Sequence, residues 1–336
     1  MDILIKSFNR PYYLDRCLFS IQKFGINFTG SIYVLDDGTP QKFLDKIVLK
    51  YPYIKIVKTE FYDKKSKLIQ SNSIKEILEI PIKTWITCAG NTSEYFLLIE
   101  DDFWFIRYFN FGFFNGIVKD NDLAILKLIW LGNKKVISGI TQREEKKYLI
   151  YKPNLDSFNP FYFKLFFCTN RFKIRKIFKQ LNVFSDKKCL NYYSIYSVAG
   201  AVFNKEYFVN LWKNNNGKVD EKLQIYNALK FLGKKNHFKF ARTNVEYFKT
   251  GFISSATNKK DNNIQIDMFQ FNNVLNESWL KGEFLTTQDL KNDICEEKIM
   301  RVLENHKEEN HIKGELWKSW VLSFKNQFRA IGCKID

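Results

Sequence analysis

The sequence has few of the side chains that bind transition metals or cross-link secreted proteins. Its three histidines (His237, His306 and His311) form no H-x-x-x-H motif and no His/Cys cluster of the kind that a zinc hydrolase uses. Its six cysteines are widely spaced and include no C-x-x-C pair, which argues against both a disulfide framework and a structural zinc site. We therefore expect a reducing compartment, and oxygen ligands for any metal.

Long apolar runs are also missing. No uninterrupted stretch of about 18 apolar residues occurs, so a membrane-spanning helix is not expected. The segment from Met1 to Phe8 includes Asp2 and Lys6, where a secretory signal would need an apolar run. We therefore expect a cytoplasmic protein that is neither secreted nor membrane-spanning, and that can bind peripherally to the inner face of a membrane.

Acidic residues are outnumbered by basic ones. The chain has 53 Lys and Arg against 36 Asp and Glu, which gives a net charge of +17. The abundance of Lys, Asn, Ile, Phe and Tyr is typical of proteins from AT-rich genomes, so the full excess of +17 is not taken as a sign of function. The remainder indicates anionic partners such as phosphate esters, a membrane surface or nucleic acid. The 33 Phe, 17 Tyr and 7 Trp residues supply enough apolar surface for a sizeable core.

The first 130 residues alternate between strand and helix patterns. Short runs rich in Ile, Val and Tyr predict strands over residues 2–8, 31–35, 54–58 and 95–99. Apolar residues at helical spacing predict helices over residues 11–24, 41–50 and 72–88. This order predicts an α/β fold with a mostly parallel, Rossmann-like sheet flanked by helices on both faces.

Polar and acidic residues follow three of the predicted strands. Residues 7–10 read Ser-Phe-Asn-Arg, residues 36–39 read Asp-Asp-Gly-Thr, and residues 100–102 read Glu-Asp-Asp. In parallel sheets, ligands bind beyond the carboxyl ends of the strands, so these residues are expected to converge on one site. Three consecutive acids would repel one another unless a cation lay among them, and a divalent ion with oxygen ligands meets that need.

These segments resemble the GT-A glycosyltransferases, most nearly the family 2 type. The Ser-Phe-Asn-Arg segment resembles the opening of that family, residues 34–39 resemble its V-x-D-D-G-S segment, and Glu-Asp-Asp resembles its D-x-D metal motif. The last motif departs from the family pattern and also resembles the E-D-D of GT-A N-acetylglucosaminyltransferases. The donor sugar is therefore left open.

The resemblance implies a GT-A fold and a nucleotide-sugar donor, with UDP-sugars favoured. The residues implied for the nucleotide sugar are Ser7, Asn9, Arg10, Asp36, Asp37 and Asp101. Asp102, with Glu100 beside it, is implied to bind Mn²⁺ or Mg²⁺, which would stabilise the negative charge of the departing diphosphate. Lys64, Lys65 and Lys67 could lie near that diphosphate or on a solvated loop. The plainer alternatives are a hydrogen-bonded turn at Asp36 and Asp37 and a solvated strand end at residues 100–102.

The second half is expected to bind the acceptor. Residues 197–208 resemble the family's G-A-x-x-F-x-x-x-x-F segment near the reaction centre, although a packed strand and turn would look the same. Asp220 and Glu221 precede an amphipathic helix that ends at Gly233 and resemble the family's E-D element, which holds the catalytic base of an inverting transfer. Acidic residues are also favoured at helix starts by capping alone. A retaining mechanism remains an alternative.

Two further segments are basic and aromatic. Residues 161–188 suit single-stranded nucleic acid, an anionic lipid surface or a lipid-diphosphate acceptor, or form an amphipathic helix over the core. The segment from Ile312 to Gly332 predicts a helix with an aromatic face and a cationic edge. That helix could dock on the catalytic domain, pair with another subunit or lie on an anionic membrane surface. Residues 283–310 are predicted to be helical, and residues 258–273 to be a polar loop.

The sequence as a whole predicts a GT-A catalytic domain over residues 1–257 and a mainly helical extension with an amphipathic tail over residues 258–336. Within the first domain, residues 1–130 are expected to bind the nucleotide sugar and residues 131–257 the acceptor. We expect a metal-dependent, inverting glycosyltransferase that acts on a glycan or lipid-linked glycan in surface polysaccharide or glycoconjugate biosynthesis. A nucleic-acid-binding protein is the alternative, disfavoured because carboxylates in a cleft would repel phosphate. The first 40 residues lack the Gly-rich phosphate loop of a sugar nucleotidyltransferase.

Overall fold

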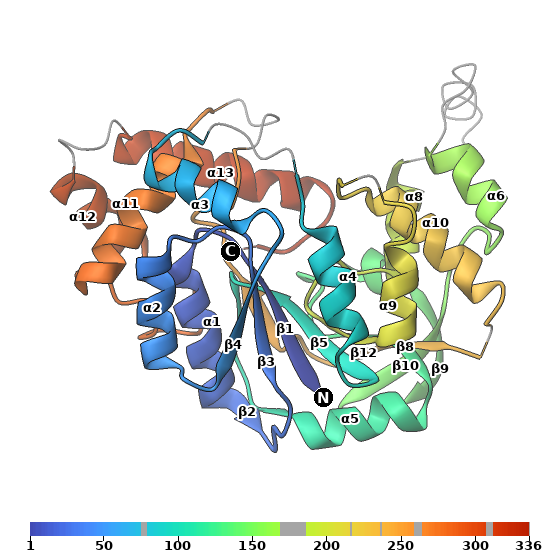
Figure 1. Ribbon diagram of the computed structural model, residues 1–336. Coiled ribbons are helices and arrows are strands. Elements are labelled where there is room, and N and C mark those ends of the chain that lie inside the picture. The colour runs from blue at the N-terminus through green and yellow to red at the C-terminus, as the bar shows by residue number, and fades with distance from the viewer. Residues whose placement is uncertain are drawn as a thin grey trace.

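The computed structural model describes residues 1–74, 79–168, 186–215, 217–235, 237–258, 264–306 and 312–335. Its centre is a nine-stranded sheet in the order β4-β3-β1-β5-β11-β8-β12-β10-β9, with helices on both faces (Figure 1). The predicted α/β fold is therefore confirmed.

The first half of the sheet is parallel. It consists of β1 (Asp2–Ser7), β3 (Ile32–Asp36), β4 (Ile54–Lys58) and β5 (Tyr95–Glu100). The chain moves outward from β1 through β3 to β4 and then returns to place β5 on the other side of β1. Loops after β1 and β5 diverge at this reversal of strand order, where open α/β sheets bind their ligands.

The second half of the sheet is mixed. Strand β11 (Ala201–Asn204) runs antiparallel to both of its neighbours, β5 and β8 (Leu123–Lys127). Strand β12 (Lys239–Thr243) is parallel to β8, and the β9–β10 hairpin completes the edge. The remaining strands are β9 (Gly139–Glu144), β10 (Tyr148–Pro153), β2 (Gly25–Ile26), β6 (Phe103–Phe105), β7 (Phe109–Asn110) and β13 (Phe248–Thr250).

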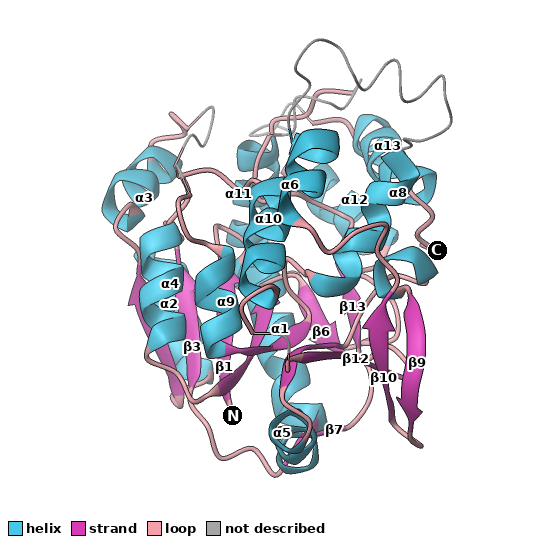
Figure 2. Cartoon of the chain, turned by 90° about the vertical axis from the view of Figure 1, so that its right-hand side faces the viewer, coloured by secondary structure: helices cyan, strands magenta, loops and turns pink. Residues whose placement is uncertain are grey.

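Alternation along the strands builds a core on each face of the sheet. Ile3 and Ile5 of β1 point into one core, and Leu4 points into the other. The first core is covered by α1 (Pro11–Phe24), α2 (Gln41–Lys50), α5 (Phe111–Asp120), α11 (Met268–Lys281), α12 (Glu296–Asn305) and α13 (Gly314–Ala330). The second is covered by α4 (Ile82–Gly90), α6 (Pro160–Phe163), α8 (Asp186–Tyr192), α9 (Lys205–Leu211) and α10 (Glu221–Leu232), several of which stand in front of the sheet in Figure 2.

The local sequence pattern located most elements of the first half. Helices α1 and α2 have the predicted bounds, but the single helix predicted over residues 72–88 is wrong. Helix α3 (Tyr62–Gln70) ends before Asn72, which adopts a left-handed φ of 52°, and α4 begins only after Pro81. Proline lacks the N–H that a helix interior needs, so it marks a start rather than a middle. Residues 75–78 of the predicted helix lie outside the described residues.

The C-terminal residues form helices packed on the first core. The predicted amphipathic tail is helix α13, and Trp317, Trp320 and Phe324 on its aromatic face are buried. The indole Nε1 of Trp317 donates a hydrogen bond to the carbonyl of Ile253 at 2.9 Å. Of the three alternatives for this helix, the structure shows docking on the core. The part of the chain that the structure describes contains no helix long and apolar enough to cross a membrane.

The segments before α13 only partly match expectation. Helix α11 begins at Met268, inside the predicted polar loop, because the Asp267 side chain caps it by accepting from the backbone N–H groups of Phe269 and Gln270. Helix α12 covers only the later part of residues 283–310. The predicted domain boundary at residue 257 stays a prediction.

Replacing Trp317 with alanine should destabilise the fold strongly. The change opens a cavity in the core and leaves the Ile253 carbonyl without its donor, so the free energy of unfolding should fall by about 3–5 kcal/mol. Leu322 on the same helix is 56% exposed. Leu322→Ala should therefore change stability by less than about 0.5 kcal/mol. Equal effects of the two substitutions on urea unfolding would contradict the docking of this helix.

Candidate active site

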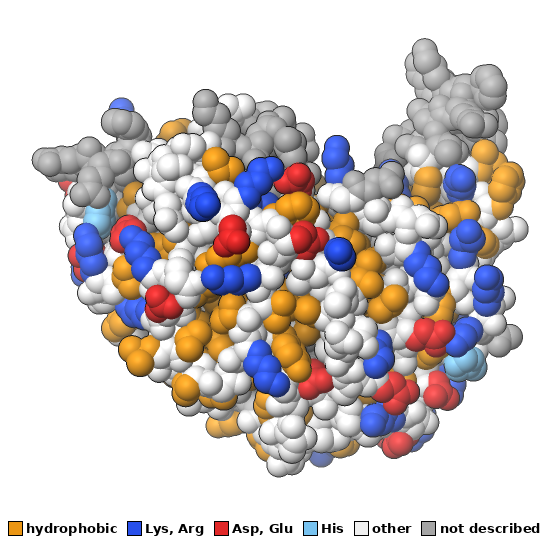
Figure 3. Space-filling model, viewed as in Figure 1, with side chains coloured by type: hydrophobic (Ala, Val, Ile, Leu, Met, Phe, Trp, Pro, Cys, Tyr) orange, Lys and Arg blue, Asp and Glu red, His pale blue; other side chains and the backbone are white. Residues whose placement is uncertain are grey.

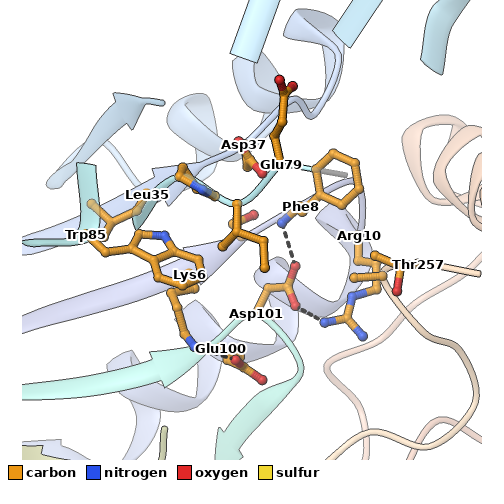
Figure 4. A pocket seen from close by; sticks show the side chains of 14 residues that line it. Lys6, Phe8, Arg10, Leu35, Asp37, Glu79, Trp85, Glu100, Asp101 and Thr257 are labelled. Carbon is orange, nitrogen blue, oxygen red and sulfur yellow. Dashed lines mark hydrogen bonds and ion pairs between the residues drawn. The ribbon is translucent and has the colours of Figure 1, made fainter. Parts of the chain in front are cut away.

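A pocket of about 190 Å³ lies at the carboxyl edge of the sheet, where β1 and β5 diverge (Figure 4). Its wall combines the ends of β1, β3 and β5 with one side chain of α4 and the loop after β13. The residues that matter for its chemistry are Lys6, Ser7, Phe8, Arg10, Asp37, Trp85, Glu100, Asp101 and Thr257. The sequence predicted that residues 7–10 and 100–102 converge, and the structure brings them together here.

The three consecutive acids are each paired with one of two cations of the protein itself. The Arg10 guanidinium pairs with Asp101 and also donates from Nη1 to Asp102 Oδ2 at 2.9 Å. The Lys6 ammonium lies 2.6 Å from Glu100 Oε1. Side chains from β1 and the loop that follows it thus offset part of the repulsion that led to the expectation of a divalent ion.

Burial governs the charge of this cluster. Asp101 is only 1% exposed, and burial raises its pKa to about 7, with the Arg10 charge opposing the rise and Asp102 adding to it. Burial likewise raises the pKa of Asp102 against the influence of Arg10. Burial disfavours the charged guanidinium, but the two carboxylates raise the pKa of Arg10 above its ordinary value. The contacts between Arg10 and the two carboxylates therefore favour the charged forms that burial disfavours.

The site offers one oxygen that suits a metal. Asp102 Oδ1 is buried and has no hydrogen-bond partner, whereas Oδ2 of the same side chain accepts from Arg10. Among the described residues, no three His, Cys, Asp or Glu side chains are grouped to hold an ion. Mg²⁺ is usually bound by one or two carboxylates together with substrate phosphates, so this donor set fits an ion that arrives with a nucleoside diphosphate.

Asp36 builds the turn after β3. It is fully buried, and its two carboxylate oxygens accept from the hydroxyl of Ser7 at 3.0 Å, from the backbone N–H of Gly38 at 3.1 Å, and from the N–H and hydroxyl of Thr39, each at 2.7 Å. Burial raises the pKa of Asp36 to about 6. These contacts match the alternative of a hydrogen-bonded turn, and a direct nucleotide contact by Asp36 stays a prediction.

Asp37 faces the pocket, and a buried lysine holds it in place. Its Oδ1 accepts from the Thr59 hydroxyl at 2.5 Å, and its Oδ2 pairs with Lys65 of α3. Lys65 is 5% exposed and also donates to the carbonyl of Glu79 at 2.7 Å. Burial raises the pKa of Asp37, and the hydrogen bond and charge of Lys65 oppose that rise. The solvated-loop alternative for Lys65 is wrong, because this lysine is a buried residue of α3.

Asn9 does not line the pocket but shapes it. It is fully buried and has a left-handed φ of 51°, which turns the chain sharply from β1 into α1. Its backbone N–H donates to the Thr39 hydroxyl at 2.9 Å. Asparagine is one of the few non-glycine residues that tolerate this conformation.

The predicted acceptor segment packs beside the pocket. Gly200 has a φ of 70°, and a Cβ at this position would lie 2.2 Å from a methyl of Ile129, so the turn into β11 requires glycine. The carbonyl of Val198 accepts from the Lys6 ammonium at 3.3 Å. The packed strand and turn is thus present, and a role of this segment at the reaction centre stays a prediction.

The two candidate bases differ in their surroundings. Asp220 is exposed and caps α10 by accepting from the backbone N–H of Leu223 at 3.0 Å. Glu221 is half-buried and accepts a hydrogen bond from the Tyr193 hydroxyl. After burial, the charges of Glu221, Glu100 and Asp220 all raise the pKa of Tyr196, so this shift does not distinguish the two candidates. Glu221 is therefore the candidate whose carboxylate is oriented by a tyrosine, whereas the carboxylate of Asp220 caps a helix.

A buried lysine supports the turn that carries these tyrosines. Lys127, at the end of β8, donates to the carbonyls of Val136 at 2.9 Å and Tyr196 at 2.7 Å, and also to that of Tyr193. Burial lowers the pKa of Lys127 to about 7. All three donors of the ammonium are thereby satisfied, which fixes the turn beside α10.

Sequence patterns gave no reason to select Lys6, Trp85, Tyr193 or Thr257. Lys6 directly follows the apolar run Ile3–Ile5 inside a predicted strand, and this charge was the one available signal. The other three reach the site only through contacts between distant segments. Residues 169–185 of the basic and aromatic stretch lie outside the described residues, so its predicted roles stay predictions.

No protein-family model and no curated protein sequence matches the chain. Among solved structures it is similar to S. aureus TarS 1–349, at 12% identity and a TM-score of 0.37 over 98% of this chain and 80% of that one. It is also similar to the galactosyltransferase LgtC in complex with donor and acceptor sugar analogues, at 11% identity and a TM-score of 0.32 over 68% of this chain and 70% of that one. A third similar structure is that of the bifunctional glycosyltransferase WbbM, at 10% identity and a TM-score of 0.34 over 82% of this chain and 49% of that one. At such identities, function has to be argued from this chain's own residues.

Proposed function

We propose that this chain is a metal-dependent glycosyltransferase that moves a hexosyl or N-acetylhexosaminyl group from a nucleoside-diphosphate sugar, with UDP-sugars favoured, to a glycan or lipid-linked glycan. The observation that carries the proposal is the pocket at the β1–β5 divergence, which Asp37 and Arg10 line, together with the unpartnered Oδ1 of Asp102, whose other oxygen accepts from Arg10. A nucleotide sugar needs the same combination of a polar contact for the nucleoside, positive charge for the phosphates and an oxygen ligand for their metal ion.

The pocket wall suits the nucleoside and its phosphates. Phe8 and Trp85 supply aromatic surface, and Asp37 supplies a carboxylate held rigidly by Lys65. Arg10 brings a guanidinium, whose planar donor set matches phosphate oxygens well. Ser7, Asn9, Asp36 and Asp101 contribute through the turns and ion pairs that hold these groups in place.

The metal would be held by Asp102, with Glu100 as its neighbour. When bound, Mn²⁺ or Mg²⁺ would stabilise the charge that develops on the departing diphosphate. Glu100 has to exchange its Lys6 partner to contribute, whereas Asp102 Oδ1 is already without one. Arg10 keeps Asp101 and Asp102 in position during this exchange.

Glu221 is the proposed base of an inverting transfer. It would accept the proton of the acceptor hydroxyl as that oxygen attacks the anomeric carbon. Two observations favour it over Asp220: the Tyr193 hydrogen bond orients it, and it is half-buried whereas Asp220 is exposed. Asp220 already serves α10 as its cap.

The charge of the chain supports an acceptor with negative groups, such as a lipid-linked diphosphate glycan in surface polysaccharide synthesis. Since the aromatic face of α13 is buried, any attachment to an anionic membrane would use exposed cations such as Lys318 on its outer side. On the face seen in Figure 3, Lys and Arg side chains are scattered among acidic ones and form no continuous basic track. The described residues on this face therefore offer no continuous basic track for a nucleic acid.

Thermal stability in the presence of nucleotides tests the proposal. UDP, GDP, CMP, dTDP and a short single-stranded DNA would each be added with and without Mn²⁺. A ligand at 100 times its Kd stabilises the folded state by about 2.7 kcal/mol, so a rise with one nucleoside diphosphate that requires Mn²⁺ is expected. A rise with DNA alone, indifferent to the metal, would instead support nucleic-acid binding.

A further inference from the structure

Helix α11 carries two asparagines among mostly apolar buried side chains. Asn272 and Asn276 lie one helical turn apart, and both are fully buried beside Phe271 and Leu275. The helix packs against α1 and α2, next to the loops that form the pocket. A buried amide lowers stability unless its hydrogen bonds are made, so packing alone would favour apolar residues at these positions.

Asn276 binds the loop after β1. Its Nδ2 donates to the backbone carbonyl of Asn9 at 3.1 Å and to the Asn9 side-chain oxygen at 3.0 Å. Both bonds secure the left-handed conformation of Asn9. The residues on either side, Phe8 and Arg10, line the pocket, so the direction of their side chains depends on this one backbone conformation.

Asn272 binds the loop after β13, residues 251–257, which we call the strap. Its Nδ2 donates to the carbonyl of Ser255 at 2.9 Å, and its Oδ1 accepts from the Tyr12 hydroxyl at 2.8 Å. That hydroxyl also lies 2.6 Å from the Ser254 hydroxyl. Thr257, at the end of the strap, lies beside Arg10 in the pocket wall (Figure 4).

The strap is tied to its surroundings at further points. The backbone N–H of Gly251 donates to the carbonyl of Asp102 at 2.9 Å, and that of Phe252 donates to Asp293 Oδ2 at 2.7 Å. The strap thus runs from the acidic cluster to Arg10, and residues of the C-terminal helical region hold it in the middle.

We infer that α11 is a structural part of the proposed donor pocket, with Asn276 and Asn272 as positioning residues for the loop at residues 7–10 and for the strap. The inference rests on the proposed function only in taking UDP with Mn²⁺ as the ligand. A pocket held in its binding shape by these bonds loses less conformational entropy when the ligand binds, so breaking them should weaken binding.

Hydrogen exchange of the ligand-free protein tests the positioning role directly. Asn276→Ala should speed exchange of the Phe8 and Asn9 amides by about tenfold or more, and Asn272→Ala should do the same for the strap. Val274→Ala removes packing from the same helix without touching either loop, and Asn273→Ala is a half-exposed control. Unchanged exchange in both loops, or the same pattern in Val274→Ala, would overturn the inference.

Calorimetry with UDP and Mn²⁺ supplies the second readout. Asn276→Ala should raise the Kd about tenfold at a temperature where the variant is fully folded, whereas Val274→Ala should keep the Kd of the unmodified protein even if its melting temperature is lower. An unchanged Kd in Asn276→Ala, with normal binding by the unmodified protein, would refute the role in binding. If the unmodified protein binds no nucleoside diphosphate, the proposed function fails, and hydrogen exchange still decides the inference.

Discussion

Asp102→Asn is expected to abolish the Mn²⁺-dependent part of UDP binding and to lower turnover by about 10²–10³-fold. Asp102 Oδ1 is the buried carboxylate oxygen of the acidic cluster that has no partner, and the amide that replaces it carries no charge to attract the metal. Calorimetric titration of UDP with and without Mn²⁺, together with initial rates of transfer, would measure both effects.

The fold should survive this substitution and even gain stability at neutral pH. Because burial raises the pKa of Asp102 above its unfolded value, the stability linked to this group is fully present below the unfolded pKa and is lost as the pH rises through the folded one. Asparagine does not ionise, so the variant does not lose this stability as the pH rises. Arg10 also keeps its partner Asp101. The stability difference between variant and unmodified protein should therefore grow from pH 4 to pH 8 in thermal unfolding.

Asp122→Asn is the matched control, since Asp122 is exposed in the turn before β8 at the opposite edge of the sheet and its left-handed φ of 49° suits asparagine. It should leave both nucleotide binding and turnover unchanged. Normal Mn²⁺-dependent binding by Asp102→Asn would remove this residue from the metal site.

Glu221→Gln should keep donor binding and lose transfer. A general base contributes about 10²–10⁴-fold to rate, and glutamine preserves the size of the side chain without its basicity. The Kd for UDP with Mn²⁺ should stay within about twofold, because Glu221 is not among the residues of the pocket wall. Single-turnover transfer to an acceptor glycan would separate the two effects.

Asp220→Asn is the natural companion, because asparagine caps a helix about as well as aspartate does. Helix α10 should therefore remain intact, and turnover should stay close to normal. The reverse outcome, with transfer lost in Asp220→Asn and kept in Glu221→Gln, would make Asp220 the base. Normal turnover in both variants would place the base outside this segment.

The sequence predicted well what depends on neighbouring residues. The strands of the parallel half and the helices α1, α2 and α10 follow from apolar periodicity and local start and stop signals, such as Pro11 and Gly233. The prediction for the segment between β4 and β5 was wrong because it relied on apolar periodicity alone. Its apolar residues suggested one helix, while the turn at Asn72 and the proline at position 81 produced two separate ones.

The position of the candidate site could be predicted from the sequence, but its ion pairs and hydrogen bonds could not. The rule that ligands bind at the carboxyl edge located residues 7–10, Asp37 and the acidic cluster, because it depends only on strand order. The ion pairs of Arg10 and Lys6, the fully bonded Asp36 and the buried Lys65 depend on which side chains meet in space. The repulsion between three consecutive acids suggested a metal ion. In the folded protein, cations that are not next to these acids in the sequence offset part of that repulsion.

The contacts of α11 also determine when the pocket can exist during folding. The bond between Asn276 and Asn9 joins residues 267 positions apart, and the bond between Tyr12 and Asn272 joins residues 260 positions apart. Contacts of such sequence separation form late, because a long loop has to close first. A growing chain would thus complete its parallel sheet well before the loops at its carboxyl edge are fixed. Nucleotide binding should consequently be one of the last properties to appear on refolding, after the recovery of secondary structure.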